Sequence, residues 1–304
     1  MNTPFLSIVI ANYNFGRFLE KAIQSVITQD MREQVELIIS DAASTDNSVD
    51  IIKKYAAGLP PNTPLQDWIR QSADYQVPQS SNQLITWWCS EKDGGQSAAF
   101  NKGFAHARGR FLTWLNADDV FTPGALKSIA KAIQRNPGCE WFIGSSVWTD
   151  AELRIHRCFC AHRFSVLRAK HGMLSVGGPS SFFTKRLLDE AGGFDEGLHY
   201  KMDTDLWNRF YRKCGARYCR VRHNIFAYRQ HEASKMSGAD SHTTERALIN
   251  RRRALEEAEV LKQRYGDQTG WSAKLIRFAT LSLVDHLVVL WRNFRWKGKR
   301  ATEI

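Results

Sequence analysis

Short apolar runs and stretches with helical spacing alternate along the N-terminal third of the chain. Leu6–Ile10 and Val35–Ile39 have the length and the β-branched, apolar character of buried parallel strands. Between them, from Phe18 to Ile27, apolar residues recur every three or four positions, as on one face of a helix. Strand, helix and strand in this order predict a βαβ unit with parallel strands and a right-handed crossover.

The same alternation continues into the middle of the chain. Further strands are predicted at Ile85–Cys89, Phe111–Leu115 and Trp141–Trp148. Further helices are predicted at Val49–Tyr55, Ala98–Arg108, Gly124–Gln134 and Leu206–Tyr211, and the Pro-, Ser- and Gln-rich residues 58–82 are predicted to be mostly loop. This pattern predicts an α/β fold, Rossmann-like, whose mixed, mainly parallel sheet is flanked by helices.

Two long helical patterns end the chain, at Thr243–Tyr265 and Trp271–Trp296. They predict a helical extension over residues 243–304, after a larger domain over residues 1–242. The second pattern has one apolar stripe, which polar residues interrupt and which is too short to span a bilayer. The stripe consists of Ile276, Ala279, Leu283, Leu287 and Leu290.

The net charge of +11 is concentrated in this extension, which holds 13 Lys and Arg against 7 Asp and Glu. Basic and aromatic residues follow the stripe directly: Arg292, Arg295, Trp296, Lys297, Lys299 and Arg300. Cations and tryptophan beside an apolar helix are typical of a membrane interface. We therefore expect membrane-surface contact through residues 271–300 and no nucleic-acid partner. Packing of this helix on the catalytic domain or on a second subunit is the open alternative.

The remaining composition is that of a folded chain in a reducing compartment. Hydrophobic residues make up 43% and aromatic residues 12%, which argues against disorder. The six cysteines form no Cys-x-x-Cys pair, and no basic region or cleavage site accompanies the first apolar run. We expect no signal peptide and a cytoplasmic location, or a peripheral one at the inner face of the cell membrane.

Polar clusters stand at the ends of three predicted strands: Asn12–Asn14, Asp41–Asp46 and Asn116–Asp119. A fourth, Glu91–Gln96, follows the third strand along the chain. Each cluster alone could be an ordinary turn. In open α/β sheets, however, ligands bind at the carboxyl edge of the strands, so four clusters at this edge predict a binding site.

Asp118 and Asp119 are adjacent carboxylates directly after a buried strand. Their mutual repulsion is unfavourable unless a positive charge neutralises them, and Mg²⁺ or Mn²⁺ prefers such oxygen ligands. The alternative is a helix N-cap, because Pro123 and Gly124 follow closely. The residues leave both possibilities open.

Taken in order, these motifs resemble the family-two inverting glycosyltransferases, which have the GT-A fold, over residues 5–237. The matching pieces are Ser7–Asn14, Asp41 with Ser44-Thr45-Asp46, Glu91–Gly95 with Asn101-Lys102-Gly103, Trp114–Asp119, Gly192–Glu196, Met202–Trp207 and His231–Lys235. The resemblance implies a nucleotide-sugar half over residues 1–120 and an acceptor half over residues 121–242. It implies metal-dependent transfer from a nucleoside-diphosphate sugar, by default a UDP-sugar, to a saccharide or lipid-linked hydroxyl acceptor. Synthesis of a cell-surface polysaccharide or glycoconjugate is the expected context.

The resemblance also implies a role for each matching residue. Asp203 is the expected general base. The expected nucleotide-sugar contacts are Ala11, Tyr13, Asn14, Asp41, Asp93, Asn116, Asp118, His231 and Lys235. Asp118, Asp119 and His231 are the expected ligands of a divalent metal, Mn²⁺ or Mg²⁺. The alternatives are an N-cap for Asp203, a satisfied surface histidine for His231, and a structural turn for Gly192-Gly193-Phe194.

Three positions depart from the family's pattern. Ala42 follows Asp41 where a second acidic residue is frequent, Asn116 stands at the first position of the Asp-x-Asp motif, and Ala98 replaces a frequent acidic residue. These changes keep open a degenerate nucleotide-sugar-binding protein. A nucleotidyltransferase is the other alternative, although the loop Ala11–Arg17 has a single glycine. Oligomer formation is also open.

Overall fold

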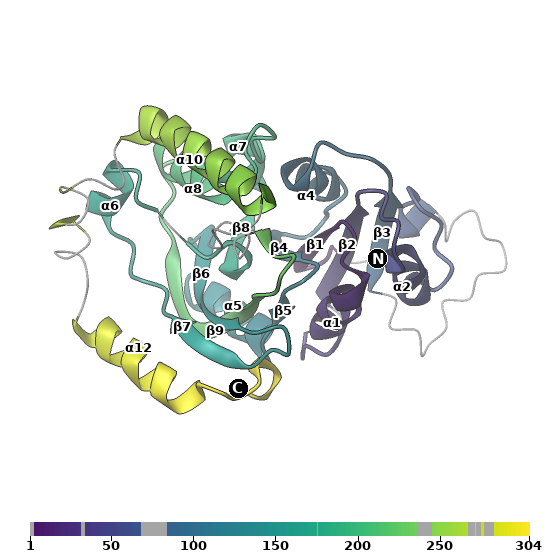
Figure 1. The fold of residues 1–304 in the computed structure, drawn as a ribbon, viewed down its shortest axis with the longest axis horizontal. Helices are drawn as coiled ribbons and strands as arrows, with labels where there is room; N and C mark the ends of the chain where they lie inside the picture. The colour runs from purple at the N-terminus through teal and green to yellow at the C-terminus, as the bar shows by residue number, and fades with distance from the viewer. Residues whose placement is uncertain are drawn as a thin grey trace.

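The computed structural model of the protein describes residues 3–31, 34–67, 84–174, 176–235, 245–266, 271, 275–276 and 283–304. Nine strands form one curled sheet, and helices cover both of its faces (Figure 1). The strands are β1 (Leu6–Asn12), β2 (Val35–Asp41), β3 (Ile85–Ser90), β4 (Phe111–Asn116), β5 (Val120–Phe121), β6 (Trp141–Thr149), β7 (Ile155–Phe159), β8 (Ser181–Thr184) and β9 (Cys219–Arg229).

Nine α-helices are assigned within the described residues. They are α1 (Gly16–Ile27), α2 (Ser48–Ala56), α4 (Gln96–Ala105), α5 (Ala125–Arg135), α6 (Val166–Lys170), α7 (Lys185–Ala191), α8 (Met202–Arg212), α10 (Glu245–Tyr265) and α12 (Leu283–Trp296). Two short 3-10 helices, η2 (Gly178–Ser180) and η3 (Ala301–Glu303), accompany them. In this part of the chain, no helix has the length and hydropathy needed to cross a bilayer.

The strand order is β3-β2-β1-β4-β8-β6-β9-β5, with β7 beside β6. The first four strands in this order run parallel, and β8 is antiparallel to both of its neighbours. In register, Asn12 lies opposite Asp41, Ala11 opposite Asn116, and Asp41 opposite Ser90. The polar ends of four strands are therefore level at one edge of the sheet, as predicted.

The two faces of the sheet bury separate apolar cores. One core packs α1, α2 and α5 under the sheet, with residues such as Ile8 and Ile23 fully buried. The other packs α4, α7 and α8 and takes in Leu261 of α10. Three tryptophans stack through its centre: Trp207 lies 5.5 Å from Trp114 and 5.4 Å from Trp141 between ring centroids. Both cores end at the carboxyl edge of the strands and hold it rigid.

The Gly192-Gly193-Phe194 turn belongs to the second core. Gly192 and Gly193 have φ of +91° and +72°, a left-handed conformation that favours glycine. Phe194 is buried, and its ring meets the Trp114 ring edge-on at 5.2 Å. The structural interpretation of this motif is therefore supported.

The predicted elements in the first half of the chain are confirmed, with small shifts at their ends. Strands β5, β7, β8 and β9 were not predicted, because β5 and β8 are very short and β7 and β9 carry several polar residues. The predicted helix Trp271–Trp296 is described as a continuous helix from Leu283 onward, and most of residues 271–282 lie outside the described residues. Residues 68–83 of the predicted loop and residues 236–244, around the predicted domain boundary, also lie outside them.

Helix α4 approaches the sheet closely at Gly103. A Cβ atom at this position would lie 2.3 Å from Val9 Cγ1 and 3.4 Å from Ile38 Cγ2. We expect Gly103→Ala to lower the free energy of unfolding by about 1–3 kcal/mol through this overlap. Helix propensity alone would favour the alanine, so a loss of stability isolates the steric effect.

Urea unfolding of Gly103→Ala measures this effect, and Gly138→Ala is the matched control. A Cβ at Gly138 meets no atom within 4 Å and the backbone is not left-handed there, so stability should stay the same or rise slightly, because alanine restricts the unfolded chain. Equal stability of Gly103→Ala and the wild type would contradict the close approach of α4.

Candidate functional site

The side chain of Asp41 ties the ends of three strands together. It is fully buried, and its Oδ1 accepts hydrogen bonds from Asn12 Nδ2 at 2.6 Å and from Ser44 Oγ at 2.5 Å. Its Oδ2 accepts from the Ser44 amide at 3.0 Å and from Ser90 Oγ at 2.6 Å. Asp41 thus organises the predicted nucleotide loops, and its predicted contact with a nucleoside remains a prediction.

The loop after β1 is held in one shape. Asn14 has a left-handed φ of +55°, its amide donates to Ser44 Oγ at 2.8 Å, and its Oδ1 accepts from the Thr45 amide at 2.8 Å. Ala11 is partly buried at the end of the strand, whereas 59% of Tyr13 is exposed. An aromatic ring on a fixed loop offers a flat apolar surface to a planar ligand.

Asp93 lies in the turn that leads into α4. Its Oδ1 accepts the Gly95 amide at 2.8 Å, and Gly95 has a φ of +110°. Its Oδ2 is buried and has no hydrogen-bond partner among the residues that the structure describes. A buried acceptor without a partner is unfavourable, so this oxygen is suited to a ligand donor.

Asp118 and Asp119 differ in their surroundings. Asp119 is 0% exposed, and its two oxygens accept from the Arg229 amide at 2.9 Å and from Asn116 Nδ2 at 2.7 Å. Burial, and then the Asp118 charge, raise the pKa of Asp119 well above its ordinary value. Asp118 is 8% exposed, and its Oδ2 lies 3.1 Å from His231 Nε2. The helix N-cap alternative for this pair is wrong, because Gly124 is the N-cap of α5.

His231 is buried against aromatic rings rather than lying on the surface. Its ring centroid lies 4.3 Å from that of Phe18 and 5.6 Å from that of Phe15. Its Nδ1 accepts the Ala233 amide at 3.3 Å, so Nε2 carries the proton in the neutral ring and donates it to Asp118. The surface-histidine alternative is therefore wrong.

A relay of side chains links Lys235 to the carboxylate pair. Lys235 Nζ donates to Gln96 Oε1 and to the His199 carbonyl, both at 2.8 Å. Gln96 Nε2 donates to Asn116 Oδ1 at 2.8 Å, and Asn116 in turn donates to Asp119. An aspartate at position 116 could not donate, so the departure from the family's motif supplies the middle of this relay.

Arg229 was not singled out from the sequence, although it lies beneath the site. It is 1% exposed, its guanidinium lies 4.7 Å from the Phe18 ring centroid, and its Nε and Nη2 are buried without a hydrogen-bond partner in the described structure. Burial lowers the pKa of Arg229, while Asp119 and Asp118 act to raise it. The chain has 42 Lys and Arg residues, and no sequence motif distinguishes Arg229 from the others.

Asp203 lies in the first turn of α8, whose N-cap is Lys201, so the N-cap alternative is wrong. Its Oδ1 accepts the Thr204 amide at 2.6 Å, and a Cβ on Gly178 would lie 3.6 Å from its Oδ2. The side chain is partly accessible, and burial raises the pKa of Asp203 above the ordinary value. The small neighbouring glycine leaves space beside the carboxylate.

The carboxylate–imidazole pair has the chemistry of a small metal site. Asp118 offers oxygen, and His231 would offer Nε2 once its proton moved to Nδ1, which gives up the 3.3 Å contact with the Ala233 amide. This donor set suits Mn²⁺, with the remaining positions left for water and phosphate oxygens. Each Asp119 oxygen already accepts an N–H, so this residue braces the site. In the described part of the chain, no three His, Cys, Asp or Glu side chains gather as a metal cluster.

The chain is similar to curated relatives that are themselves uncharacterized glycosyltransferases. One from Nostoc sp. is 36% identical over 129 residues, which cover 42% of this chain and 33% of the relative. One from Mycobacterium tuberculosis is 27% identical over 197 residues, which cover 64% of each chain. The chain thus spans from a third to just under two thirds of the length of these relatives.

Solved structures have the same mixed α/β GT-A fold. S. aureus TarS 1–349 in complex with UDP-GlcNAc has a TM-score of 0.57 at 14% identity, covering 92% of this chain and 77% of that chain. The mannosyltransferase PcManGT from Pyrobaculum calidifontis, with GDP-Man and Mn²⁺, has a TM-score of 0.56 at 15% identity, covering 96% of this chain and 80% of that chain. The family model named Glycosyl transferase family 2 matches residues 7–184, more than half of the sequence. The chain therefore belongs to glycosyl transferase family 2.

Proposed function

We propose that the protein transfers a sugar from a nucleoside-diphosphate sugar to a hydroxyl acceptor, with inversion and with the help of a divalent metal. One observation carries this proposal. The Asp118–His231 pair, with its 3.1 Å contact, lies at the same sheet edge as the loops that end β1 and β2. Ligand-binding loops and a charge-stabilising pair are what a nucleotide-sugar site requires at this edge.

The nucleotide half of the donor occupies the loops around Tyr13, Asn14 and Asp93, with Ala11 and Asp41 behind them. The exposed Tyr13 ring and the unpaired Asp93 Oδ2 support this placement. TarS was solved with UDP-GlcNAc and PcManGT with GDP-Man, so the fold accommodates both pyrimidine and purine nucleotides. A UDP-sugar is our default donor.

The diphosphate lies toward Asp118, His231 and Lys235. A divalent metal held by Asp118 and His231 supplies positive charge where the leaving nucleoside diphosphate becomes more negative. The relay from Lys235 through Gln96 and Asn116 ends on Asp119, next to Asp118 in the chain. The buried Arg229 adds a fixed positive charge below the carboxylate pair.

Asp203 is the base that takes the proton of the acceptor hydroxyl. Its raised pKa makes it a stronger base than an ordinary aspartate. Direct attack by the acceptor inverts the anomeric carbon and needs no covalent intermediate. The acceptor is a saccharide or lipid-linked hydroxyl in polysaccharide or glycoconjugate synthesis.

Helix α12 supports a peripheral membrane contact on the cytoplasmic face. Leu287, Leu290, Trp291 and Phe294 recur at steps of three and four and are exposed, Phe294 by 90%. The opposite side of the helix packs inward, where Asn293 Oδ1 accepts the Cys158 amide at 2.8 Å. The basic residues after the stripe favour anionic lipid.

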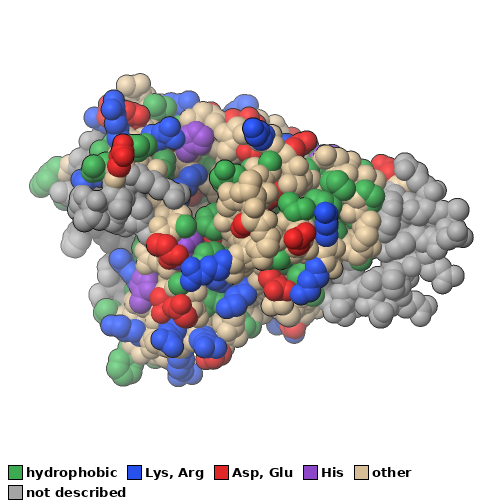
Figure 2. Space-filling view, turned by 45° about the vertical axis from the view of Figure 1, so that its right-hand side comes forward, with side chains coloured by type: hydrophobic (Ala, Val, Ile, Leu, Met, Phe, Trp, Pro, Cys, Tyr) green, Lys and Arg blue, Asp and Glu red, His purple; other side chains and the backbone are tan. Residues whose placement is uncertain are grey.

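On the face drawn in Figure 2, basic and acidic side chains are interspersed, whereas a nucleic-acid-binding groove is lined mainly by basic ones.

The first prediction concerns donor turnover. Purified protein with Mn²⁺ should release nucleoside diphosphate from one member of a panel of nucleotide sugars. Asp118→Ala should lower the release about 100-fold or more, because the charge on the leaving group loses its stabilisation. Asp30→Ala, which removes an exposed surface partner of Lys127, should leave the rate unchanged. Pyrophosphate release from a nucleoside triphosphate and a sugar phosphate would support a nucleotidyltransferase instead.

The second prediction concerns the Asp203 carboxylate. Asp203→Asn should lower transfer by about 10²- to 10⁴-fold, as expected for loss of a general base. Burial raises the folded-state pKa of Asp203, so its charge opposes folding at pH values above that pKa. This penalty fades as pH falls from the folded-state pKa towards the lower unfolded value, and it is absent below the unfolded value. Asp203→Asn should therefore raise Tm at pH 7, with a smaller gain at pH 4. In the wild type, kcat/KM should fall with decreasing pH through a pKa above that of an ordinary aspartate. A lower Tm together with full activity would argue against both roles.

The third prediction concerns lipid binding. The full chain should co-sediment with vesicles that contain anionic phospholipid, and Leu290→Glu/Phe294→Glu should reduce the bound fraction about tenfold or more. Leu255→Glu, at an exposed leucine of α10, is the matched control. Equal binding by both variants would favour an interface between proteins, which sedimentation without lipid would reveal as a change in oligomeric state.

A further inference from the structure

The loop that leads into the Asp203 helix is held by a buried carboxylate from α10. Glu257 is 7% exposed, and its Oε1 accepts the His199 amide at 2.8 Å. Its Oε2 accepts the Tyr200 amide at 2.7 Å and the Lys201 amide at 2.9 Å. One side chain of the C-terminal extension therefore binds three consecutive backbone N–H groups, the last of them at the N-cap of α8.

The carbonyl groups of Leu198 and His199 in the same loop accept hydrogen bonds from side chains near the proposed sugar-donor site. Ser97 Oγ, in the first turn of α4, donates to the Leu198 carbonyl at 2.7 Å. Lys235 Nζ donates to the His199 carbonyl at 2.8 Å, while it also holds Gln96 of the relay. The loop is thus fixed between the proposed diphosphate region and α10, and Asp203 follows it directly.

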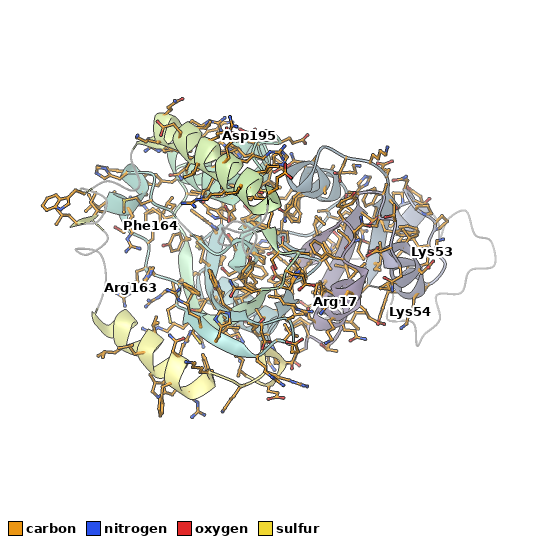
Figure 3. All side chains as sticks on the ribbon, in the orientation of Figure 1. Arg17, Lys53, Lys54, Arg163, Phe164 and Asp195 are labelled. Atoms are coloured by element: carbon orange, nitrogen blue, oxygen red, sulfur yellow. The ribbon has the colours of Figure 1, made fainter. Side chains whose placement is uncertain are left out.

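A second contact locks α10 onto α8. Arg264 Nη1 donates to Asp205 Oδ1 and to Asp195 Oδ2, both at 2.8 Å. Tyr265 donates to the same Asp205 oxygen at 2.8 Å, and Asp205 is fully buried. Asp195 lies on the side of the molecule where α8 and α10 run (Figure 3). Leu261, between these polar contacts, is buried in the core that also contains Trp207.

Three amides that converge on one carboxylate form an anion-binding concavity, and hydrogen bonds to a charged acceptor are stronger than neutral ones. Without the Glu257 carboxylate, the amides of residues 199–201 lose their acceptor together. The loop must then move for these N–H groups to find new acceptors. Such movement would displace the first turn of α8 and with it the Asp203 carboxylate. Proton transfer requires hydrogen-bond distance, so a shift of this kind affects turnover before donor binding.

We propose that Glu257 is a positioning residue, which sets residues 199–201 and thereby places Asp203 for proton transfer. The C-terminal helix α10 is then part of the catalytic apparatus of the domain. This inference rests on the proposed function, because it takes Asp203 as the base. Glu257 itself touches neither donor nor acceptor.

The test compares Glu257→Gln with Glu256→Gln. Glu256 is its exposed neighbour on α10 and pairs with Arg252 on the surface. In Glu257→Gln the side chain keeps its size, but its NH₂ group faces backbone donors. We expect kcat for nucleoside-diphosphate release to fall about 10- to 100-fold, the effect of a shift of about 1 Å in a reacting group. The donor KM should change by less than about threefold, because the donor loops lie elsewhere. Glu256→Gln should match the wild type in both constants.

Ile129→Ala separates positioning from stability. It removes a buried side chain of α5 in the core on the other face of the sheet and should lower Tm at least as much as Glu257→Gln, yet keep kcat within about twofold at a temperature well below Tm. Hydrogen exchange of the peptide that contains residues 199–201 reads the loop directly. Its amides should exchange faster in Glu257→Gln and remain protected in Glu256→Gln.

Three results would overturn the inference. Unchanged exchange of these amides in Glu257→Gln would show that the carboxylate does not hold the loop. Faster exchange with unchanged kcat would show that the loop does not place Asp203. Equal losses of kcat in Ile129→Ala and Glu257→Gln would show that lower stability alone explains the effect. A wild type that is inactive on every donor would instead overturn the proposed function, and this inference with it.

Discussion

Asp119 is the carboxylate on which the arrangement of the site depends, because it joins parts of the sheet that are distant in sequence. It accepts the Arg229 amide at the end of β9 and the Asn116 side chain at the end of β4. A fully buried charge is strongly unfavourable without such partners. These bonds hold the His231 segment against the neighbouring Asp118. Of the two aspartates at the family's metal position, Asp119 supports the site and Asp118 faces it.

Much of the fold could be predicted because buried parallel strands are apolar along most of their length. β1 and β4 are runs of this kind, and the polar residues that end them marked the binding edge. β9 could not be predicted, because its N-terminal part includes Arg220, Arg222 and His223. Its C-terminal part is nevertheless buried and contributes Arg229 to the site.

The site residues were predictable as far as they stand in local motifs. Asp118, His231 and Asp203 were singled out in this way, and their functional roles stay predictions. Their environments contradict the N-cap and surface alternatives. Arg229 and Glu257 were not found, because their importance comes from partners far away along the chain. Glu257 lies 58 positions from the His199 amide that it binds, and in sequence it resembles the nearby exposed residues Glu256 and Glu259 of the same helix.

Hydrogen bonds within the protein already order the loop after β1 without a ligand. Asn14 is fixed at both its amide and its side chain, and the Gly16 amide is bound by Asp46 at 2.8 Å. A preordered loop loses little conformational entropy on association, so more of the contact energy appears as affinity. At the proposed nucleotide site, binding would need no slow rearrangement of this loop. Differences in affinity between nucleotides would then arise mainly in the rates at which they dissociate.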